Sequence, residues 1–144
     1  MPIDTVADDD VVLLDTSAGV ALVLEDHEGH AATLDAVAGR RLGLAGHAWF
    51  ETWSVLTRLP AGLRRSPSDA VRLLSHDFPV AAFLGESESR ELAAEVSRLG
   101  ISGGAVYDAL VGAAARQHGH VLLSRDRRAA PVYQALGVTV RLLP

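Results

Sequence analysis

Four acidic residues stand at places in this sequence where a folded domain would ordinarily bury an apolar side chain. They are Asp15, Glu51, Asp108 and Asp126. If the fold gathers them, their charges repel: at about 4 Å and an effective dielectric constant of about 20, one pair costs roughly 4 kcal/mol. A divalent cation is the simplest way to remove this cost. The four acids therefore indicate a metal-dependent enzyme that acts on phosphate esters, and an all-oxygen ligand set favours Mg²⁺ or Mn²⁺ over zinc.

Two of the acids follow apolar runs that are typical of strands. Asp15 comes directly after residues 11–14, and Asp126 comes two residues after the run 121–124. Continuous apolar runs of this kind are typical of parallel strands covered on both faces. Ligands of open α/β sheets bind beyond the carboxyl ends of the strands. If the two strands are parallel, Asp15 and Asp126 lie at the same edge of the sheet.

The other two acids lie inside helical patterns. Glu51 falls in a helix expected over residues 48–59, and Asp108 in one expected over residues 105–118. If Ser102 caps the second helix, Asp108 lies beyond its first turn, among small and apolar neighbours. Such an acid is either partly buried or lines a pocket.

Each acid also has a simpler explanation. Asp15 is a good helix N-cap, and Asp126 can be a turn residue paired with a neighbouring arginine. Glu51 can serve the helix dipole or pair with Arg58, and Asp108 can pair with Arg116. One shared site explains all four acids better than four separate roles do.

The remaining patterns define the fold class. Helices are expected over residues 18–25, 29–38, 48–59, 67–76, 86–99, 105–118 and 129–136, and strands over residues 11–15, 41–45, 120–124 and 138–142. Strands separated by helices predict an α/β fold, here a single domain with a mainly parallel sheet of about four to five strands and helices on both faces. We expect a polar N-terminal tail over residues 1–10 and the folded domain over residues 11–144.

Composition narrows the choice of function. The 144 residues include no cysteine and no lysine, which excludes thiolate zinc sites, Schiff-base chemistry and a phosphate-loop lysine. The net charge of −5 argues against a large nonspecific nucleic-acid surface. The six histidines show no metal-binding pair at helical spacing. No apolar run approaches the about 20 residues of a membrane span, and no export signal precedes residue 11, so we expect a cytoplasmic protein without a membrane partner.

The acids and their flanking residues resemble a known family. The segments at residues 12–18, 48–52, 107–110 and 122–126 occur in the order found in PIN-domain ribonucleases, specifically the VapC toxins of bacterial toxin–antitoxin systems. The resemblance spans residues 11–143. Ser124 stands where such proteins often have threonine, which retains the hydroxyl.

The resemblance implies a Mg²⁺- or Mn²⁺-dependent endoribonuclease, usually a homodimer, that a cognate VapB antitoxin neutralises. Asp15, Glu51 and Asp108 would be its principal acids and Asp126 the fourth. The residues expected to orient the metal ligands are Thr16, Ser17 and Ser124, and those expected to hold RNA phosphates are Arg125, Arg127 and Arg128. The expected reaction is hydrolysis of a phosphodiester bond by a metal-activated water.

Three other functions compete with this one. A PIN-type domain that binds RNA or a protein without cutting is the strongest. A receiver-like signalling domain needs a lysine near its last strand, which this chain lacks. A phosphatase of the haloacid-dehalogenase type also expects a lysine, and a second acid two residues after the nucleophile, where this chain has Ser17.

Overall fold

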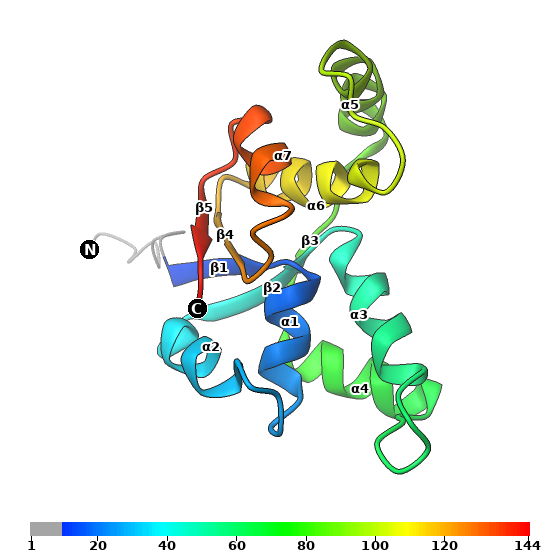
Figure 1. Ribbon diagram of the computed structural model, residues 1–144, viewed down its shortest axis with the longest axis vertical. Coiled ribbons are helices and arrows are strands. Elements are labelled where there is room, and N and C mark those ends of the chain that lie inside the picture. The colour runs from blue at the N-terminus through cyan, green and yellow to red at the C-terminus, as the bar shows by residue number, and fades with distance from the viewer. Residues whose placement is uncertain (1–9) are drawn as a thin grey trace, which may run out of the picture.

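The computed structural model describes residues 10–144, so most of the tail expected over residues 1–10 lies outside the described residues. One parallel sheet with strand order β3-β2-β1-β4-β5 forms the centre of the domain. Its strands are β1 (Val11–Leu14), β2 (Arg41–Ala45), β3 (Val80–Ala82), β4 (Val121–Ser124) and β5 (Val140–Leu142). The helices are α1 (Thr16–Val23), α2 (His30–Val37), α3 (Ala48–Thr57), α4 (Pro67–Asp77), α5 (Glu86–Arg98), α6 (Ala105–His118) and α7 (Ala130–Ala135). The expected α/β fold class is confirmed (Figure 1).

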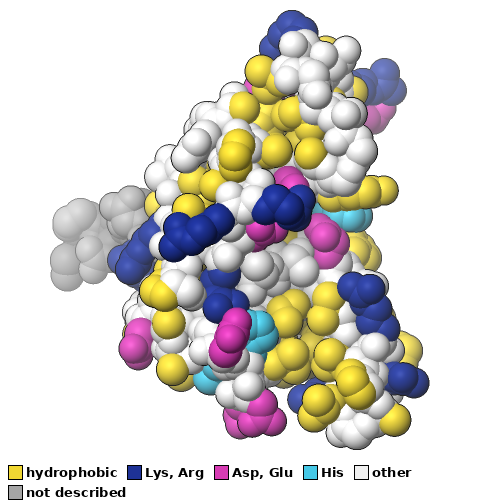
Figure 2. Space-filling view, in the orientation of Figure 1, with side chains coloured by type: hydrophobic (Ala, Val, Ile, Leu, Met, Phe, Trp, Pro, Cys, Tyr) yellow, Lys and Arg dark blue, Asp and Glu magenta, His cyan; other side chains and the backbone are white. Residues whose placement is uncertain are grey.

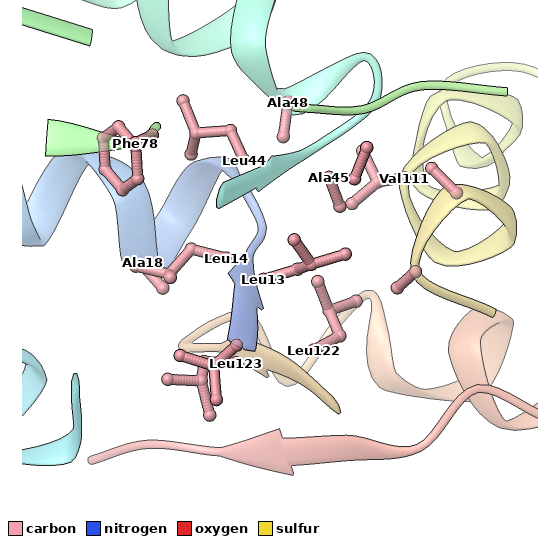
Figure 3. Packing of buried hydrophobic residues seen from close by; sticks show 14 of the residues in the cluster. Leu13, Leu14, Ala18, Leu44, Ala45, Ala48, Phe78, Val111, Leu122 and Leu123 are labelled. Atoms are coloured by element: carbon pink, nitrogen blue, oxygen red, sulfur yellow. The ribbon is translucent and has the colours of Figure 1, made fainter. Parts of the chain in front are cut away.

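Helices cover both faces of the sheet, with α1 and α2 on one side and α6 and α7 on the other (Figure 1). Successive residues of a strand point to opposite faces, so each central strand feeds both halves of the core. Leu13 points towards α6, whereas Leu14 and Ala18 lie on the opposite side (Figure 3). All four residues of β1 are buried, because β1 is the middle strand and both of its faces are covered.

The order of the strands reverses direction at β1. The chain proceeds outwards from β1 through β2 to β3, and then returns to place β4 against the other edge of β1. The register pairs Leu13 with Gly43 on one side and with Leu122 on the other. Ligand sites of open α/β sheets form at such a switch point, beyond the carboxyl ends of the strands. Asp15 follows β1 and Asp126 follows β4, so both acids lie at this point.

Three local expectations need correction. The strand β3 was not expected, because two of its three residues are alanine, which does not favour a strand. Helix α1 begins at Thr16 and not at residue 18, since the Asp15 side chain accepts a hydrogen bond from the backbone nitrogen of Ala18 and caps the helix. Helix α6 is preceded by Gly104 and not capped by Ser102, so Asp108 lies in the first turn, where the helix dipole favours a negative charge.

Among the described residues, no helix has the length and apolar character needed to span a membrane.

Candidate active site

One cavity collects all four acids predicted from the sequence. It has a volume of about 260 Å³ and is lined by Asp15, Thr16, Ser17, Glu51, Asp108, Val111, Asp126, Arg128 and Tyr133. Acidic side chains gather near the centre of the face shown in Figure 2, beside arginine side chains. The acids come from the start of α1, from α3, from α6 and from the loop after β4. Segments more than a hundred residues apart thus deliver like charges to a single pocket.

Asp15 is the most constrained of the four acids. It is 3% exposed, and its Oδ1 accepts hydrogen bonds from the Ser17 hydroxyl at 2.6 Å and from the Ala18 backbone nitrogen at 3.1 Å. Its Oδ2 accepts a hydrogen bond from the Tyr133 hydroxyl at 3.0 Å. A buried carboxylate is tolerated only when it is paired or hydrogen-bonded, and here both oxygens have donors. The N-cap explanation for Asp15 is therefore correct, but it accounts for only one of these three contacts.

The pKa values of Glu51 and Asp108 are raised by burial and by neighbouring acids. Burial raises the pKa of the Glu51 carboxyl, and the charges of Asp108 and Asp15 add to the rise, while His47 opposes it. Burial also raises the pKa of Asp108, with a contribution from Asp126. The acids are therefore close enough to influence one another's ionisation, as expected for carboxylates sharing one site.

Asp126 and Asp108 share one arginine. Arg128 Nη2 lies 2.9 Å from Asp126 Oδ2, and Arg128 Nη1 lies 3.7 Å from Asp108 Oδ2. The backbone nitrogen of Arg128 also donates to Asp126 Oδ1 at 2.9 Å. The expected turn pairing of Asp126 with arginine is thus present. Asp108 pairs with this residue, whereas Arg116 instead donates two hydrogen bonds to Glu95.

The three hydroxyl residues lie close to the acids in different ways. The Ser17 hydroxyl, besides donating to Asp15, accepts a hydrogen bond from the backbone nitrogen of Arg125 at 2.8 Å and so joins the ends of β1 and β4. The fully buried Ser124 hydroxyl accepts one from the backbone nitrogen of Asp126 at 3.0 Å. Buried Thr16 Oγ1 makes no hydrogen bond of good geometry within residues 10–144, although it lies near enough to Glu51 to lower the pKa of that carboxyl.

The chemistry of this cavity suits a hard cation, although its side chains are not arranged around one. No three His, Asp or Glu side chains within residues 10–144 are grouped closely enough to hold an ion together in this arrangement. Arg128 engages two of the acids. The donors are nevertheless carboxylate oxygens, which Mg²⁺ and Mn²⁺ prefer, and Thr16 lines the same pocket. The residues that line the cavity therefore fit a divalent cation by the type of their donor atoms.

Tyr133 is the residue at this site that the sequence did not predict. It is 1% exposed and lies on α7, within a short helix that looks like ordinary core packing. Burial raises the pKa of its phenol, and the negative charge of Asp15 adds to this effect, so the hydroxyl keeps its proton and acts as a donor. The only available signal was that a buried tyrosine hydroxyl needs a partner, which does not say which partner.

The predicted RNA-binding arginines do not share one environment. Arg128 lines the cavity. Arg125 donates from Nε to the backbone oxygen of Pro144 at 3.0 Å, and its guanidinium occupies the space that a Cβ on Gly29 would need. Arg127 is exposed to solvent.

Comparison with known proteins shows the family of this chain. The family model described as "PIN domain" matches residues 12–134. The chain is 44% identical over 127 residues to Ribonuclease VapC27 of Mycobacterium tuberculosis, covering 88% of this chain and 93% of that protein. It is 41% identical over 131 residues to Ribonuclease VapC40 of the same species, covering 90% of this chain and 96% of that protein.

A solved structure described as "FitAB bound to IR36 DNA fragment" superposes with a TM-score of 0.63 at 18% identity, covering 91% of this chain and 94% of that one, and supports the fold. The chain therefore belongs to the PIN-domain family. Within that family its relatives are VapC-type ribonucleases, as the sequence motifs predicted.

Proposed function

We propose that the chain is a divalent-metal-dependent endoribonuclease, the toxin of a toxin–antitoxin pair, which hydrolyses RNA phosphodiester bonds with water as the nucleophile. The observation that carries this proposal is the gathering of Asp15, Glu51, Asp108 and Asp126 around one cavity at the switch point of the sheet. Such a concentration of like charge destabilises the fold unless a cation occupies it. The two VapC relatives, each named a ribonuclease, support RNA as the substrate.

Asp15 and Asp108 are the direct ligands in this proposal, and Glu51 and Asp126 complete the set directly or through water. Bound Mg²⁺ or Mn²⁺ would acidify the attacking water and neutralise charge that develops on the phosphate. The hydrogen bonds from Ser17, the Ala18 backbone and Tyr133 hold the Asp15 carboxylate in one orientation. Donors of this kind orient ligands and keep them basic.

RNA would reach the cavity from the open face where acidic and arginine side chains meet (Figure 2). Arg128 is the best placed of the three predicted phosphate-binding arginines, because its side chain is 72% exposed while it lines the cavity. Arg127 is free to contact RNA further along the strand. Arg125 would contribute chiefly by closing the C-terminal segment onto the loop after β4, through its bond to Pro144.

Two protein partners belong to the proposal. A cavity of about 550 Å³ lies between the end of α1 and α4, and we assign it to a segment of a VapB-type antitoxin. Half of its lining is apolar and half is polar, so it suits an amphipathic segment; the residues are Val23, Leu24, Leu63 and Leu73, and Glu25, Asp26, His27 and Arg65. A separate aromatic patch contains Phe50 and Phe83, whose rings lie 6.2 Å apart. These two residues are 58% and 45% exposed. Exposed apolar patches mark contact surfaces, and we assign this one to a second copy of the chain. Sedimentation equilibrium tests the homodimer directly.

The cytoplasm, where RNA and antitoxin are available, is the proposed location.

The decisive test incubates purified protein with single-stranded RNA in Mn²⁺ and in EDTA. We expect cleavage only with the metal, and a loss of more than about 100-fold for Asp15→Asn and for Asp108→Asn, because even residues that merely support metal ligands contribute 10- to 100-fold. Asp35→Asn removes an exposed carboxylate of α2 and is the matched control. Circular dichroism establishes that each variant is folded.

Cleavage that persists in EDTA, or in both site variants, would refute the proposed mechanism. RNA binding by the wild type without any cleavage in Mn²⁺ would instead support the competing function, a PIN domain that binds without cutting.

A further inference from the structure

Among residues 10–144, Arg128 is the only cation that lines the acidic cavity. It lies two residues after Asp126 in the loop between β4 and α7, and its guanidinium spans the gap from Asp126 to Asp108. The acids are the more enclosed partners, with side chains 29% and 19% exposed against 72% for the arginine. Arg128 therefore covers these carboxylates from the solvent side.

The guanidinium of Arg128 is held less firmly than that of Arg116, which also bridges distant segments. Arg116 donates two hydrogen bonds to Glu95 and a third to the backbone oxygen of Leu136. Arg128, by contrast, is held at its guanidinium by the two site carboxylates alone, as far as the described residues show. An exposed ion pair of this kind contributes little to stability and breaks easily, so the side chain can leave without disturbing the core.

The oxygens that Arg128 engages are those that the proposed metal would need. A divalent cation bound to Asp126 Oδ2 and Asp108 Oδ2 would reduce the negative charge that attracts the guanidinium. A dication and a guanidinium within a few ångströms of each other would also repel. Binding of the metal therefore acts against retention of this ion pair.

We propose that Arg128 is a displaceable counter-ion, which holds Asp108 and Asp126 together in the metal-free protein and moves to an RNA phosphate once a divalent cation takes those carboxylates. This inference rests on the proposed function. It assigns one residue two successive partners, both anionic and both within reach of the same exposed side chain. The guanidinium suits each partner, because its planar fork matches both carboxylate and phosphate geometry.

The first test measures Mn²⁺ binding in the absence of RNA, by calorimetry and by the electron paramagnetic resonance signal of free Mn²⁺. Arg128→Ala should bind Mn²⁺ about 3- to 10-fold more tightly than the wild type, because the ion no longer displaces an exposed ion pair. Arg127→Ala removes the same charge from the adjacent position and should change the Kd by less than about twofold, since salt screens it. Arg128→Lys should return the Kd towards that of the wild type.

The second test measures cleavage of a single-stranded RNA at saturating Mn²⁺. Arg128→Ala should raise the KM for RNA by about 3- to 10-fold while it lowers the Kd for Mn²⁺. The slope of log RNA affinity against log salt concentration should fall by about one, as expected for the loss of one phosphate contact. A merely structural role for Arg128 would weaken both interactions together. The opposite signs of the two effects are therefore the signature of the proposed exchange.

The outcomes separate this inference from the function on which it rests. A wild type that binds Mn²⁺ and cuts RNA, with an unchanged or weaker Mn²⁺ affinity in Arg128→Ala, overturns the counter-ion role alone. An equal gain in Arg127→Ala overturns it as well, because the effect would then be one of general charge. A wild type that neither binds Mn²⁺ nor cuts RNA removes both proposals.

Discussion

At the scale of single residues, the site depends on hydrogen bonds that orient charge. Asp15 is buried with a donor on each carboxylate oxygen, and the donor on Oδ2 is the Tyr133 hydroxyl. Because burial raises the pKa of the Tyr133 phenol, the hydroxyl keeps its proton at neutral pH and can donate to Asp15. A tyrosine far along the chain thus determines how the first acid of the site is presented.

Removing this single hydroxyl tests the contact. Tyr133→Phe should lower the free energy of unfolding by about 1–3 kcal/mol, since it leaves a buried carboxylate oxygen without its donor. RNA cleavage should fall by about 10- to 100-fold, the usual effect of losing a group that orients a metal ligand. Urea denaturation and initial cleavage rates measure the two effects.

The control is Tyr107→Phe, which deletes the hydroxyl of an exposed tyrosine and keeps the ring that stacks on His47 at 5.1 Å. This variant should match the wild type. If Tyr133→Phe also matched it in both measurements, the hydrogen bond to Asp15 would have no functional weight.

At the scale of elements, close contacts between helices set the positions of these residues. Helix α6 carries Asp108 and packs against α7, which carries Tyr133. Gly112 makes the approach possible, because a Cβ there would lie 2.9 Å from Tyr133 Cδ1 and 3.1 Å from Val138 Cγ2. The position of the Tyr133 ring, and with it the donor to Asp15, therefore depends on the absence of a side chain at residue 112.

Adding one methyl group at this contact should therefore destabilise the domain. Gly112→Ala gains about 1 kcal/mol in helix propensity but overpacks the core at a cost of about 1–3 kcal/mol. The overpacking should win, because the ring it meets is buried and hydrogen-bonded, so thermal unfolding should occur about 2–4 °C lower. Gly104→Ala adds a methyl group that meets nothing within 4 Å, and it is the matched control. Equal melting temperatures for the two variants would contradict this account of the α6–α7 contact.

At the scale of the whole molecule, the crowded acids of the site lower the stability of the fold when no metal is bound. The pKa values of Glu51 and Asp108 are raised by burial and by neighbouring acids. Between the ordinary pKa of a carboxyl group and the raised value, the folded state binds more protons than the unfolded state does. The contribution of each acid to stability therefore falls as the pH rises through this window, and it stays at its lower value above it.

Neutralising one acid should reveal this cost. In the absence of metal at pH 7–8, Glu51→Gln should melt about 1–4 °C above the wild type, and the difference should vanish as the pH falls below the ordinary pKa of glutamate. Glu95→Gln supplies a contrast of opposite sign, because the hydrogen bond from Arg116 lowers the pKa of Glu95. Loss of the Glu95 charge should destabilise the protein at neutral pH and should have a smaller effect in acid. Calorimetry across this pH range measures both, and a Glu51→Gln variant less stable than the wild type at neutral pH would contradict the argument.

The sequence by itself determined the acids, the family and most of the elements. Strands β1 and β4 and helices α4 and α6 are visible in local patterns, because buried runs, a Ser66–Pro67 helix start and regular apolar spacing depend on near neighbours. The placement of Asp15 and Asp126 at strand ends was likewise a local fact, and a parallel sheet was enough to bring them to one edge.

Only the tertiary structure decided that β1 lies between β2 and β4, that Tyr133 holds Asp15, and that Arg128 bridges Asp108 and Asp126. Strand order and the partners of a buried hydroxyl are set by contacts between distant segments, whose free energy depends on the packing of the whole core. No local pattern records such contacts, and the two alanines of β3 do not favour a strand.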